Sequence, residues 1–432
     1  MDPTVDPGLR SFVELPADSP FPIQNLPYGI FTPASDPPGP PARVGVAIGA
    51  AVLDLSILAA RGLLDLPELS GRRVFAEPAL NAFMALGPPA WRAVRVRLSD
   101  LLRADVPTLR DDAELRAAAF FPQNAVTMQL PCRIGDYTDF YAGRHHAMNV
   151  GRIFRGPDAT LPPQYLHLPI AYHGRSSSLV VSGTPIRRPC GQYRPSPAAA
   201  APEFGPTREL DFELELGALI GVGNTLGTPI PVAQAEDTIF GFVLVNDWSA
   251  RDIQQWEYQP LGPFLGKNFA TTISPWVVPL AALEPFRCSG PPQSPEPLPY
   301  LRSPSSGHFA IDFEVRLQAP GMPQPVVISR TNARELYWSF AQMIAHHTVN
   351  GCNLRTGDLL ASGTISGEAP GAYGSLLELS RRGQTPLALP DGTQRSFLRD
   401  GDTLTLTGAC GTPGRRIGFG ECRGRVAGRE QR

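Results

Sequence analysis

The stretch from Phe240 to Tyr258 brings several reactive residue types close together in the chain. It opens with an apolar run, residues 239–245, that is short enough for a strand buried on both faces. The run ends at Asn246 and Asp247, so a carboxylate should stand where the strand leaves the core. The sequence therefore predicts an acidic side chain at the end of a buried strand.

A guanidinium, an amide and a phenol follow in what should be a helix. Residues 249–252 have the pattern of a capped helix start. The spacing of Arg251, Gln254 and Tyr258 then places all three side chains on one helix face. Together with Asp247 they are predicted to converge on one cleft. An ordinary ion pair between a core Asp247 and Arg251 is an equally good interpretation at this point.

A second acidic group lies in residues 210–216, where apolar and acidic side chains alternate as in a strand with one apolar face. The Cα atoms of Glu213 and Glu215 would lie ~6.5–7 Å apart on the same side of a sheet. Such close negative charges repel unless a cation lies between them. With Asp139 and Asp247 they would form an all-oxygen ligand set, which favours Ca²⁺ or Mg²⁺ over zinc. The alternative is an acidic, solvated face of an edge strand.

Histidines that could act as a base near neutral pH occur in residues 136–149. Asp139 and Tyr141 are two positions apart and would face the same way in extended chain. His145 and His146 are neighbours, so in extended backbone only one of them could face the same cleft as Asp139. Structural or solvated histidines are the more frequent alternative in a loop.

Three further residues could contribute to a site. Lys267 stands in a loop beside a glycine and can serve as a buried cation. The turn formed by residues 363–367 would bring backbone N–H groups and Thr364 close to a ligand. Residues 374–379 resemble an apolar strand, in which the carboxylate of Glu378 would be costly unless it pairs with a histidine or arginine.

The motifs of several enzyme classes do not fit. Residues 221–227 resemble a dinucleotide fingerprint but are one residue too long, and residues 262–268 lack one spacer and the Ser/Thr of a phosphate loop. The chain has neither a G-x-S-x-G nucleophile elbow nor an H-E-x-x-H zinc motif. The sequence therefore gives no support to a dinucleotide enzyme, an ATPase, a serine hydrolase or a zinc protease.

Composition limits the remaining classes. The 432 residues carry 38 basic and 40 acidic side chains, so a nucleic-acid partner or a polybasic membrane surface is not expected. With 42 glycines, 48 prolines and 42% hydrophobic residues, a loop-rich, mainly β protein is predicted. The six cysteines form no C-x-x-C pair, the first residues do not resemble a signal peptide, and no apolar run approaches the ~20 residues that span a bilayer. Reduced thiols and a cytoplasmic location are expected.

The elements that must position these residues fall into two predicted domains. Residues 1–130 should form a small supporting domain, and residues 131–432 a larger catalytic one. In the first, a hairpin is predicted from 43–48 and 51–55, with helices around 76–86, 89–104 and 108–118. In the second, a capping box at 332–335 predicts the start of a helix that ends near His346 and His347.

Four long segments carry a family resemblance: Phe21 to Gly29, Asp136 to His146, Asn246 to Pro263, and Leu359 to Gly367. On these segments the chain resembles the fumarylacetoacetate hydrolase family nearly from end to end. The resemblance implies an α+β, mainly β fold, with a small N-terminal β-barrel domain and a larger C-terminal β-roll domain, assembled as a homodimer. The implied reaction is hydrolysis of a carbon–carbon bond in 4-fumarylacetoacetate, giving fumarate and acetoacetate in tyrosine and phenylalanine catabolism.

The resemblance also implies a role for each matching residue. It assigns Ca²⁺ to Asp139, Glu213, Glu215 and Asp247, and Mg²⁺ to Asp247, Lys267 and Thr271. It assigns substrate contacts to Tyr141, Arg155, Tyr172, Gln254, Tyr258 and Thr364. His146 matches the catalytic base and Glu378 its orienting carboxylate, while Arg251, Gln254 and Lys267 match the groups that stabilise developing negative charge.

The sequence departs from the family pattern at two positions, with His145 in place of a glutamine and Met148 in place of a threonine. Two other functions fit part of this pattern. A related oxo-acid lyase, either a decarboxylase or a hydratase, would use a similar carboxylate and metal set. A non-catalytic metal-binding protein is the second alternative. The predicted N-terminal domain and the pairing of His146 with Glu378 favour the hydrolase.

Overall fold

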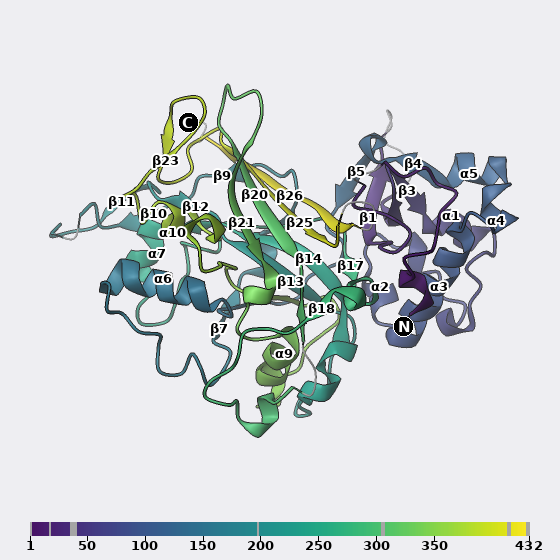
Figure 1. Ribbon diagram of the computed structural model, residues 1–432, viewed down its shortest axis with the longest axis horizontal. Coiled ribbons are helices and arrows are strands. Elements are labelled where there is room, and N and C mark those ends of the chain that lie inside the picture. Colours follow the sequence, from purple (N-terminus) through teal and green to yellow (C-terminus); the bar gives the residue numbers. More distant parts are fainter. Residues whose placement is uncertain are drawn as a thin grey trace.

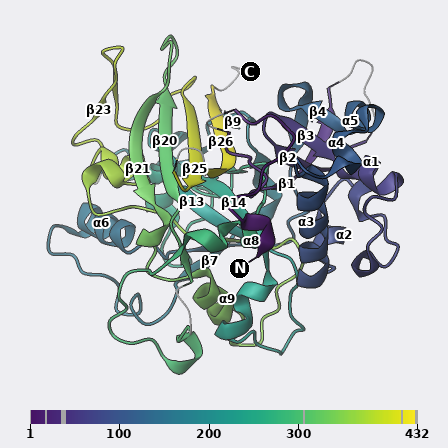
Figure 2. The same cartoon turned by 45° about the vertical axis from the view of Figure 1, so that its right-hand side comes forward.

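The computed structural model describes residues 2–16, 19–34, 41–196, 198–303, 307–412 and 416–428. Figure 1 shows two bodies side by side, a smaller one from the first part of the chain and a larger one from the rest. The turned view in Figure 2 shows the same division. Strands β13 and β14 run through the larger body, and β14 reaches toward the smaller one.

The smaller body is built on an antiparallel five-stranded sheet in the order β4-β3-β2-β1-β5. Its strands are β1 (Tyr28–Pro33), β2 (Arg43–Ile48), β3 (Ala51–Asp54), β4 (Phe120–Pro122) and β5 (Val126–Gln129). Strands β2 and β3 form the predicted hairpin, which is confirmed. Five helices accompany the sheet: α1 (Leu55–Ala60), α2 (Asn81–Met84), α3 (Pro88–Leu102), α4 (Pro107–Arg110) and α5 (Ala113–Ala119).

The larger body contains an eight-stranded mixed sheet in the order β7-β6-β22-β13-β14-β16-β8, with β17 also paired to β14. The strands are β6 (Tyr137–Phe140), β7 (Ala171–Gly174), β8 (Leu179–Val181), β13 (Leu214–Ile220), β14 (Ile239–Asp247), β16 (Thr271–Ile273), β17 (Val278–Pro279) and β22 (Leu359–Ala361). The central pair, β13 and β14, runs antiparallel, with Leu214 opposite Asn246. This sheet carries most of the acidic residues singled out in the sequence.

A second sheet, in the order β21-β20-β25-β26-β9, packs against the first through β25 and β26. Its strands are β9 (Ile186–Arg187), β20 (Asp312–Gln318), β21 (Val326–Asn332), β25 (Thr403–Cys410) and β26 (Ile417–Ala427). Short pairs complete the strands: β10 (Cys190–Tyr193) with β11 (Glu203–Pro206), β12 (Leu210–Asp211) with β15 (Ser249–Ala250), β18 (Arg287–Cys288) with β19 (His308–Phe309), and β23 (Leu387–Ala388) with β24 (Gln394–Arg395). The remaining helices are α6 (Arg144–Arg155), α7 (Arg251–Glu257), α8 (Leu280–Leu283), α9 (Phe340–Thr348) and α10 (Leu376–Leu379).

Strand β14 has every residue buried, as its continuous apolar run predicts. Phe242 and Leu244 belong to the core between the two sheets of the larger body. Phe240, Val243 and Val245 belong to a second core, which extends into the smaller body. Because the strand serves two cores, both of its faces must be apolar. The predicted α+β class with strands predominating is confirmed, and no helix in the described ranges is long and apolar enough to cross a membrane.

The predicted helices of the smaller body are only partly correct. The pattern over 76–86 gives a helix only at Asn81–Met84, because the N–H of Leu80 bonds the carbonyl of Pro131 instead of a preceding turn. The pattern over 108–118 is divided into α4 and α5. Asp112 causes this division, because its side chain accepts from the N–H of Leu115 and starts a new helix. The pattern over 89–104 is confirmed by α3.

One helix start and one helix cap in the larger body were predicted wrongly. At 332–335 the chain makes only a short 3₁₀ turn, and the capping box that opens α9 is formed by Ser339 and Gln342. At α7, no side chain in the described residues caps the helix, because Ser249 lies in β15 and its hydroxyl bonds the carbonyl of Asp247. Helix α7 itself is present and carries Arg251 in its first turn.

Residues 374–379 were predicted as a strand and form the start of a helix instead. Helix α10 spans Leu376–Leu379, and the Ser375 hydroxyl accepts from the N–H of Glu378 as its N-cap. The apolar run cannot distinguish a buried strand from one buried helical turn, because both are apolar throughout. The correction matters for the site, since Glu378 lies in this helix.

Candidate active site

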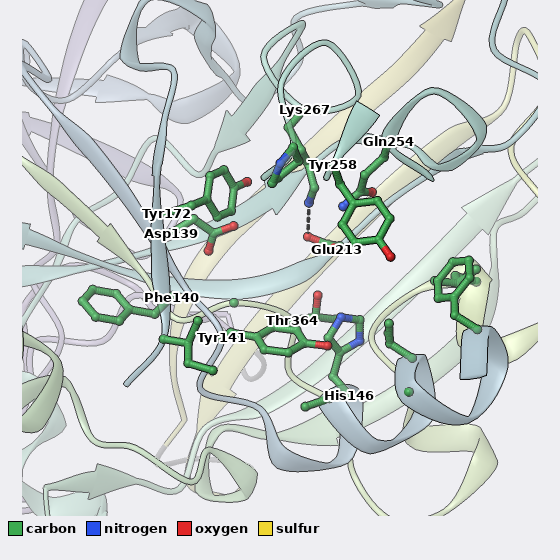
Figure 3. A pocket seen from close by; sticks show the side chains of 18 of the residues that line it. Asp139, Phe140, Tyr141, His146, Tyr172, Glu213, Gln254, Tyr258, Lys267 and Thr364 are labelled. Atoms are coloured by element: carbon green, nitrogen blue, oxygen red, sulfur yellow. Dashed lines mark hydrogen bonds and ion pairs between the residues drawn. The ribbon is translucent and has the colours of Figure 1, made fainter. Parts of the chain in front are cut away.

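A cavity of about 440 Å³ opens in the larger body, between helices α6 and α7 and the ends of β6 and β13. Figure 3 shows His146 and Tyr141 on one side of it and Lys267 and Gln254 on the other, with Glu213 between them. Most of the residues predicted from the sequence line this cavity: Asp139, Tyr141, His146, Arg155, Tyr172, Glu213, Arg251, Gln254, Tyr258, Lys267 and Thr364. Residues from distant parts of the chain thus share one pocket.

Four carboxylates form the floor beneath this pocket. Asp139, Glu213, Glu215 and Asp247 each place an oxygen within 4.8 Å of the others, and all four are buried. The sheet order explains the grouping, because β6, β22, β13 and β14 are consecutive neighbours and the acidic residues lie toward the same ends of their strands. The interpretation of Glu213 and Glu215 as the solvated face of an edge strand is wrong. Strand β13 is central in the sheet, and Glu215 is fully buried.

Two cations already pair with this acidic cluster. The ammonium of Lys267 donates to Glu213 and, at 2.7 Å, to Oδ2 of Asp247. The Nη1 atom of Arg251 lies 2.7 Å from Oε1 of Glu213. Burial acts to lower the pKa of Lys267, but Asp247 and Glu213 outweigh it and hold the pKa above its usual range. Burial acts to raise the pKa of Glu213, but Lys267 and Arg251 outweigh it and hold that pKa low. Glu213, Lys267 and Arg251 are therefore charged together.

On the other side of the cluster, the described residues supply no hydrogen-bond donor to Glu215. Both carboxylate oxygens of Glu215 and Oδ1 of Asp139 are buried without a hydrogen-bond donor in the described part of the chain. Burial raises the pKa of Asp139, and Asp247 adds to it; burial likewise raises the pKa of Glu215, and Asp139 and Asp247 add to it. Buried acceptors without donors are what an oxygen-ligated divalent cation would satisfy. The donor set therefore fits a bound metal ion.

His146 and Glu378 form a buried pair at the opposite wall. The Nδ1 atom of His146 lies 2.7 Å from Oε2 of Glu378, and each side chain is nearly inaccessible to solvent. Because an ionised carboxylate only accepts, the Nδ1 atom carries the proton, and in the neutral imidazole the Nε2 atom then has a free lone pair. The ring of Tyr141 packs edge-on against the imidazole. The pairing that Glu378 was predicted to need is present.

Three residues that were not predicted as site residues from the sequence donate hydrogen bonds to the carboxylate of Glu378. Asn149 donates to Oε1 at 2.8 Å, while the hydroxyls of Ser366 and Ser375 donate to Oε2 at 3.0 and 2.7 Å. Burial acts to raise the pKa of Glu378, but His146, Asn149 and Ser375 outweigh it and hold the pKa below its usual range. Glu378 is thus an ionised, fixed acceptor for the histidine. Asn149 lies one helical turn after His146, and this spacing was the only available signal.

His145 points elsewhere, for a reason that differs from the predicted one. Both histidines lie in helix α6 and not in extended backbone, so their directions differ by the helical turn per residue. The Nε2 atom of His145 lies 3.4 Å from Glu335, and a third of the side chain is exposed. Only His146 lines the pocket. The assignment of the base to His146, which the family resemblance implies, stays a prediction, while the assumption of extended backbone at this histidine pair was wrong.

The residues predicted to contact substrate line the pocket, but they differ in their hydrogen-bond partners and in their exposure. Tyr172 donates to Oδ2 of Asp247 at 3.1 Å, and Gln254 accepts from Arg251 at 3.3 Å. Arg155, in the last turn of α6, donates to the carbonyl of Thr160 at 2.7 Å. Tyr258 follows α7 directly and is half exposed. Arg155 and Tyr258 are exposed, whereas Tyr172 and Gln254 are partly buried.

Thr364 lies in an irregular segment, residues 362–367, and not in the predicted turn, because the N–H of Ile365 bonds the carbonyl of Leu214. Gly363 has φ +74°, and a Cβ there would lie 2.1 Å from the carbonyl oxygen of Phe140, so only glycine fits. A Cβ on Gly143 would lie 2.2 Å from the carbonyl oxygen of Thr364. These two close approaches hold this segment against the start of α6, and Thr364 and His146 line the same cavity.

The second predicted metal set shares Asp247 with the acidic cluster. Thr271 donates from its hydroxyl to Oδ1 of Asp247 at 2.8 Å, and Lys267 occupies Oδ2 of the same carboxylate. A smaller cavity of about 200 Å³ is lined by Asp247, Lys267 and Thr271. The three residues are therefore adjacent, with the lysine ammonium directed at the carboxylate.

Sequence reasoning also missed the apolar wall of the pocket. Helix α6 contributes Val150 and Phe154, and Leu377 of α10 completes the wall with Pro162 and Ile170. The hydrophobic spacing of α6 could have indicated a second face directed inward. The pocket thus combines an apolar wall with a charged floor, as in many sites for small anionic ligands.

Two family models match the chain. Residues 24–131 match "Fumarylacetoacetase N-terminal", and residues 137–427 match "Fumarylacetoacetate (FAA) hydrolase C-terminal". A solved structure described as a putative HpcE protein from Mycobacterium smegmatis is 18% identical, covers 93% of this chain and 99% of its own, and has a TM-score of 0.51. That likeness supports the fold alone.

Curated relatives named fumarylacetoacetase are much more similar in sequence. The protein from Bos taurus is 55% identical over 96% of this chain and 98% of its own length. The proteins from Homo sapiens and Arabidopsis thaliana are 54% and 53% identical over 96% and 97% of this chain, and each match covers 98% of the relative. This chain belongs to the fumarylacetoacetate hydrolase family.

Proposed function

We propose that this pocket hydrolyses the carbon–carbon bond between the fumaryl carbonyl and the acetoacetate carbon of 4-fumarylacetoacetate, giving fumarate and acetoacetate. One observation carries the proposal: a histidine fixed by a buried carboxylate, His146 with Glu378, faces the same cavity as the charged floor of Asp139, Glu213 and Lys267. The near full-length similarity to proteins named fumarylacetoacetase supports the choice of substrate.

His146 is the general base in this proposal. Its Nδ1 proton is held by Glu378, so Nε2 accepts a proton from water as that water attacks the fumaryl carbonyl carbon. The ionised Glu378 then stabilises the imidazolium that forms and keeps the ring in place. No side-chain nucleophile and no covalent intermediate are required. The same histidine can return the proton to the departing carbon.

The negative charge that develops needs donors on the other side of the bond. Arg251 is suited to this role, because its Nη2 atom is buried without a partner in the described residues while its other nitrogens are fixed by Glu213 and Asp211. Lys267 adds a charged ammonium at the pocket floor. Preorganised donors of this kind stabilise an oxyanion or enolate because they need not reorient during the reaction.

A divalent ion fits the four-carboxylate floor, and we propose Ca²⁺ at Asp139, Glu213, Glu215 and Asp247. When bound, such an ion polarises carbonyl or enolate oxygens. Mg²⁺ is proposed at Asp247, Lys267 and Thr271, where lysine can contribute only its backbone carbonyl. The buried oxygens of Glu215 and Asp139 that have no hydrogen-bond donor among the described residues support the first site. In both sites these residues would hold the ion beside the pocket.

The substrate carries a carboxylate at each end, and the pocket offers donors for both. All six predicted contacts line the pocket: Arg155 and Tyr258 are exposed, Gln254, Tyr141 and Tyr172 are partly buried, and Thr364 is buried. Burial raises the pKa of Tyr141, and Glu378 adds to it, so its phenol remains a donor at neutral pH. We propose that Arg155 and the tyrosines orient the carboxylate and oxo groups, and that Val150, Phe154 and Leu377 exclude water from the carbon chain.

We further propose that the chain works as a homodimer in the cytoplasm, in the breakdown of tyrosine and phenylalanine. The family resemblance supports the dimer, and the six cysteines, all free thiols, are compatible with a reducing compartment. Light scattering of the purified protein at micromolar concentration tests the assembly. A mass close to twice 46.6 kDa is expected, and a monomer mass would remove this part of the proposal.

The experiment for the proposed function follows loss of the diketone absorbance and identifies the products. Purified enzyme supplied with Ca²⁺ or Mg²⁺ should convert 4-fumarylacetoacetate to equimolar fumarate and acetoacetate. A decarboxylase would release carbon dioxide, and a hydratase would leave the carbon chain intact, so the same analysis distinguishes the lyase alternative. Absence of both products from active, correctly folded protein would contradict the hydrolase assignment.

A further inference from the structure

Asp211 lies outside the pocket lining, yet it contacts Arg251 and the start of α10, the helix that carries Glu378. It ends β12 and is fully buried. Strand β12 pairs with β15, which leads directly into α7 and therefore into Arg251. This location places one carboxylate between the helix that carries the candidate oxyanion donor and the helix that carries the orienting carboxylate.

One set of contacts fixes helix α10. The N–H of Leu376 donates to Oδ1 of Asp211 at 2.7 Å, and the N–H of Leu377 donates to Oδ2 at 2.9 Å. These are the first two N–H groups of the helix, which have no acceptor inside it. Glu378 is the next residue along the chain. Asp211 therefore determines where the backbone of Glu378 lies.

A second contact fixes the guanidinium of Arg251. Its Nε atom donates to Oδ2 of Asp211 at 2.9 Å. Since Nη1 bonds Glu213 and Gln254, only Nη2 is left without a partner in the described residues. The N–H of Phe212 gives Oδ1 of Asp211 a further donor at 2.8 Å. Both oxygens are thus fully used by fixed donors.

We propose that Asp211 is a positioning residue that holds the His146–Glu378 pair and Arg251 at a fixed separation across the pocket. The inference rests on the proposed function, because it concerns the distance between the general base, His146, and the charge-stabilising group, Arg251. A displacement of about 1 Å between such groups can cost on the order of a hundredfold in rate. Asp211 does not itself line the pocket and reaches it only through Arg251 and the backbone of α10, so its loss should affect turnover much more than substrate binding.

The test uses Asp211→Asn, which has the same size but places an amide N–H₂ against donors. Asp402→Asn is the matched control. Asp402 is also fully buried, accepts from Arg395 at 2.8 and 2.9 Å and from the N–H of Arg399 at 2.8 Å, and lies outside the pocket lining. We expect Asp211→Asn to lower kcat by about ten- to a hundredfold with KM changed less than about threefold, and Asp402→Asn to leave both near wild type.

Two readouts separate positioning from a general loss of stability. The loss caused by Asp211→Asn should be smaller in a Glu378→Gln background, because the two residues act through one unit. The low-field proton resonance of His146 Nδ1 should shift in Asp211→Asn and stay in place in Asp402→Asn. Equal losses in both backgrounds, or an unmoved resonance, would overturn the proposal.

A second variant covers the possibility that asparagine prevents folding. Asp211→Ala removes both oxygens without setting two donors against each other, and it should show the same kcat loss. If both Asp211 variants are unfolded at 25 °C while Asp402→Asn folds, Asp211 is structural and the proposal is wrong. If wild-type enzyme and the control variant both fail to form fumarate and acetoacetate, the proposed function fails instead, so the two failures are distinguishable.

Discussion

The Nδ1 atom of His146 lies 2.7 Å from Oε2 of Glu378, although the residues are 232 positions apart in the chain. Helix α6 supplies the histidine and helix α10 the carboxylate, and both side chains are buried. This contact fixes the tautomer that leaves Nε2 free to act as a base. The two residues should therefore behave as one catalytic unit.

Substitution of the histidine tests which member of the adjacent pair is the base. His146→Ala should lower turnover by roughly a hundredfold or more, the usual scale for loss of a general base. His145→Ala is the matched control, because its side chain contacts Glu335 and not the pocket, and it should change turnover only slightly. Steady-state rates of both variants check the assignment. An inactive His145→Ala beside a fully active His146→Ala would reverse it.

The carboxylate partner gives a second prediction. Glu378→Gln keeps the size of the side chain but replaces an accepting oxygen by an amide, so the tautomer of His146 is no longer fixed. Turnover should fall to about the level of His146→Ala. The double variant should lose little more than either single variant, because residues of one unit are not additive. Multiplied losses in the double variant would mean that the two residues act independently.

Removal of the metal ligands gives a third prediction. Glu215→Gln should weaken binding of a divalent ion by at least about a hundredfold, because its two oxygens have no other donor in the described residues. Elemental analysis and calorimetric titration with Ca²⁺ measure this independently of activity. Glu236→Gln, at a carboxylate paired with Arg287 outside the acidic cluster, is the control and should bind the ion as wild type does. Undiminished binding by Glu215→Gln would exclude this residue as a ligand.

The stability of the protein should also depend on pH through a histidine remote from the reaction. Burial lowers the pKa of His308, and the Leu336 carbonyl that it contacts at 2.9 Å offsets this only in part. Below the unfolded-state pKa of about 6.5, the unfolded chain therefore binds more protons than the native state at this residue, and stability falls as the pH falls.

His308→Gln should reduce this acid sensitivity. Urea unfolding at two pH values, one above and one below about 6.5, measures the change in midpoint. The wild-type midpoint should drop more on acidification than that of the variant. Identical drops would show that His308 does not contribute, and a larger drop in the variant would reverse the sign of the argument.

Local patterns in the sequence predicted the acidic floor well. The apolar run before Asp247 predicted a strand with two buried faces, and β14 serves two cores. The two-residue spacing of Glu213 and Glu215 predicted neighbouring carboxylates, and these lie just before and just inside the start of β13, where the neighbouring strands supply Asp139 and Asp247. Period and burial are local properties, so one sequence was sufficient to predict them.

Contacts between distant segments could not be read from the sequence in the same way. Glu378 was assigned to a strand because a single buried helical turn has no period to detect. The bonds from Ser366 and Ser375 to Glu378, and from α10 to Asp211, depend on how loops meet across the fold, with Asp211 lying 165 positions before Leu376. The family resemblance supplied the pairing of His146 with Glu378, while the argument from strand alternation failed because α6 is helical.

The most direct test of the account is turnover in water enriched in the heavy oxygen isotope. If His146 activates water for attack on the fumaryl carbonyl, mass spectrometry should find one solvent oxygen in the new carboxylate of fumarate from the wild-type enzyme. Acetoacetate quenched at once should carry none from the cleavage, and His146→Ala should form labelled fumarate at least about a hundredfold more slowly. Fumarate without solvent oxygen, or carbon dioxide as the first product, would contradict hydrolytic cleavage in this pocket.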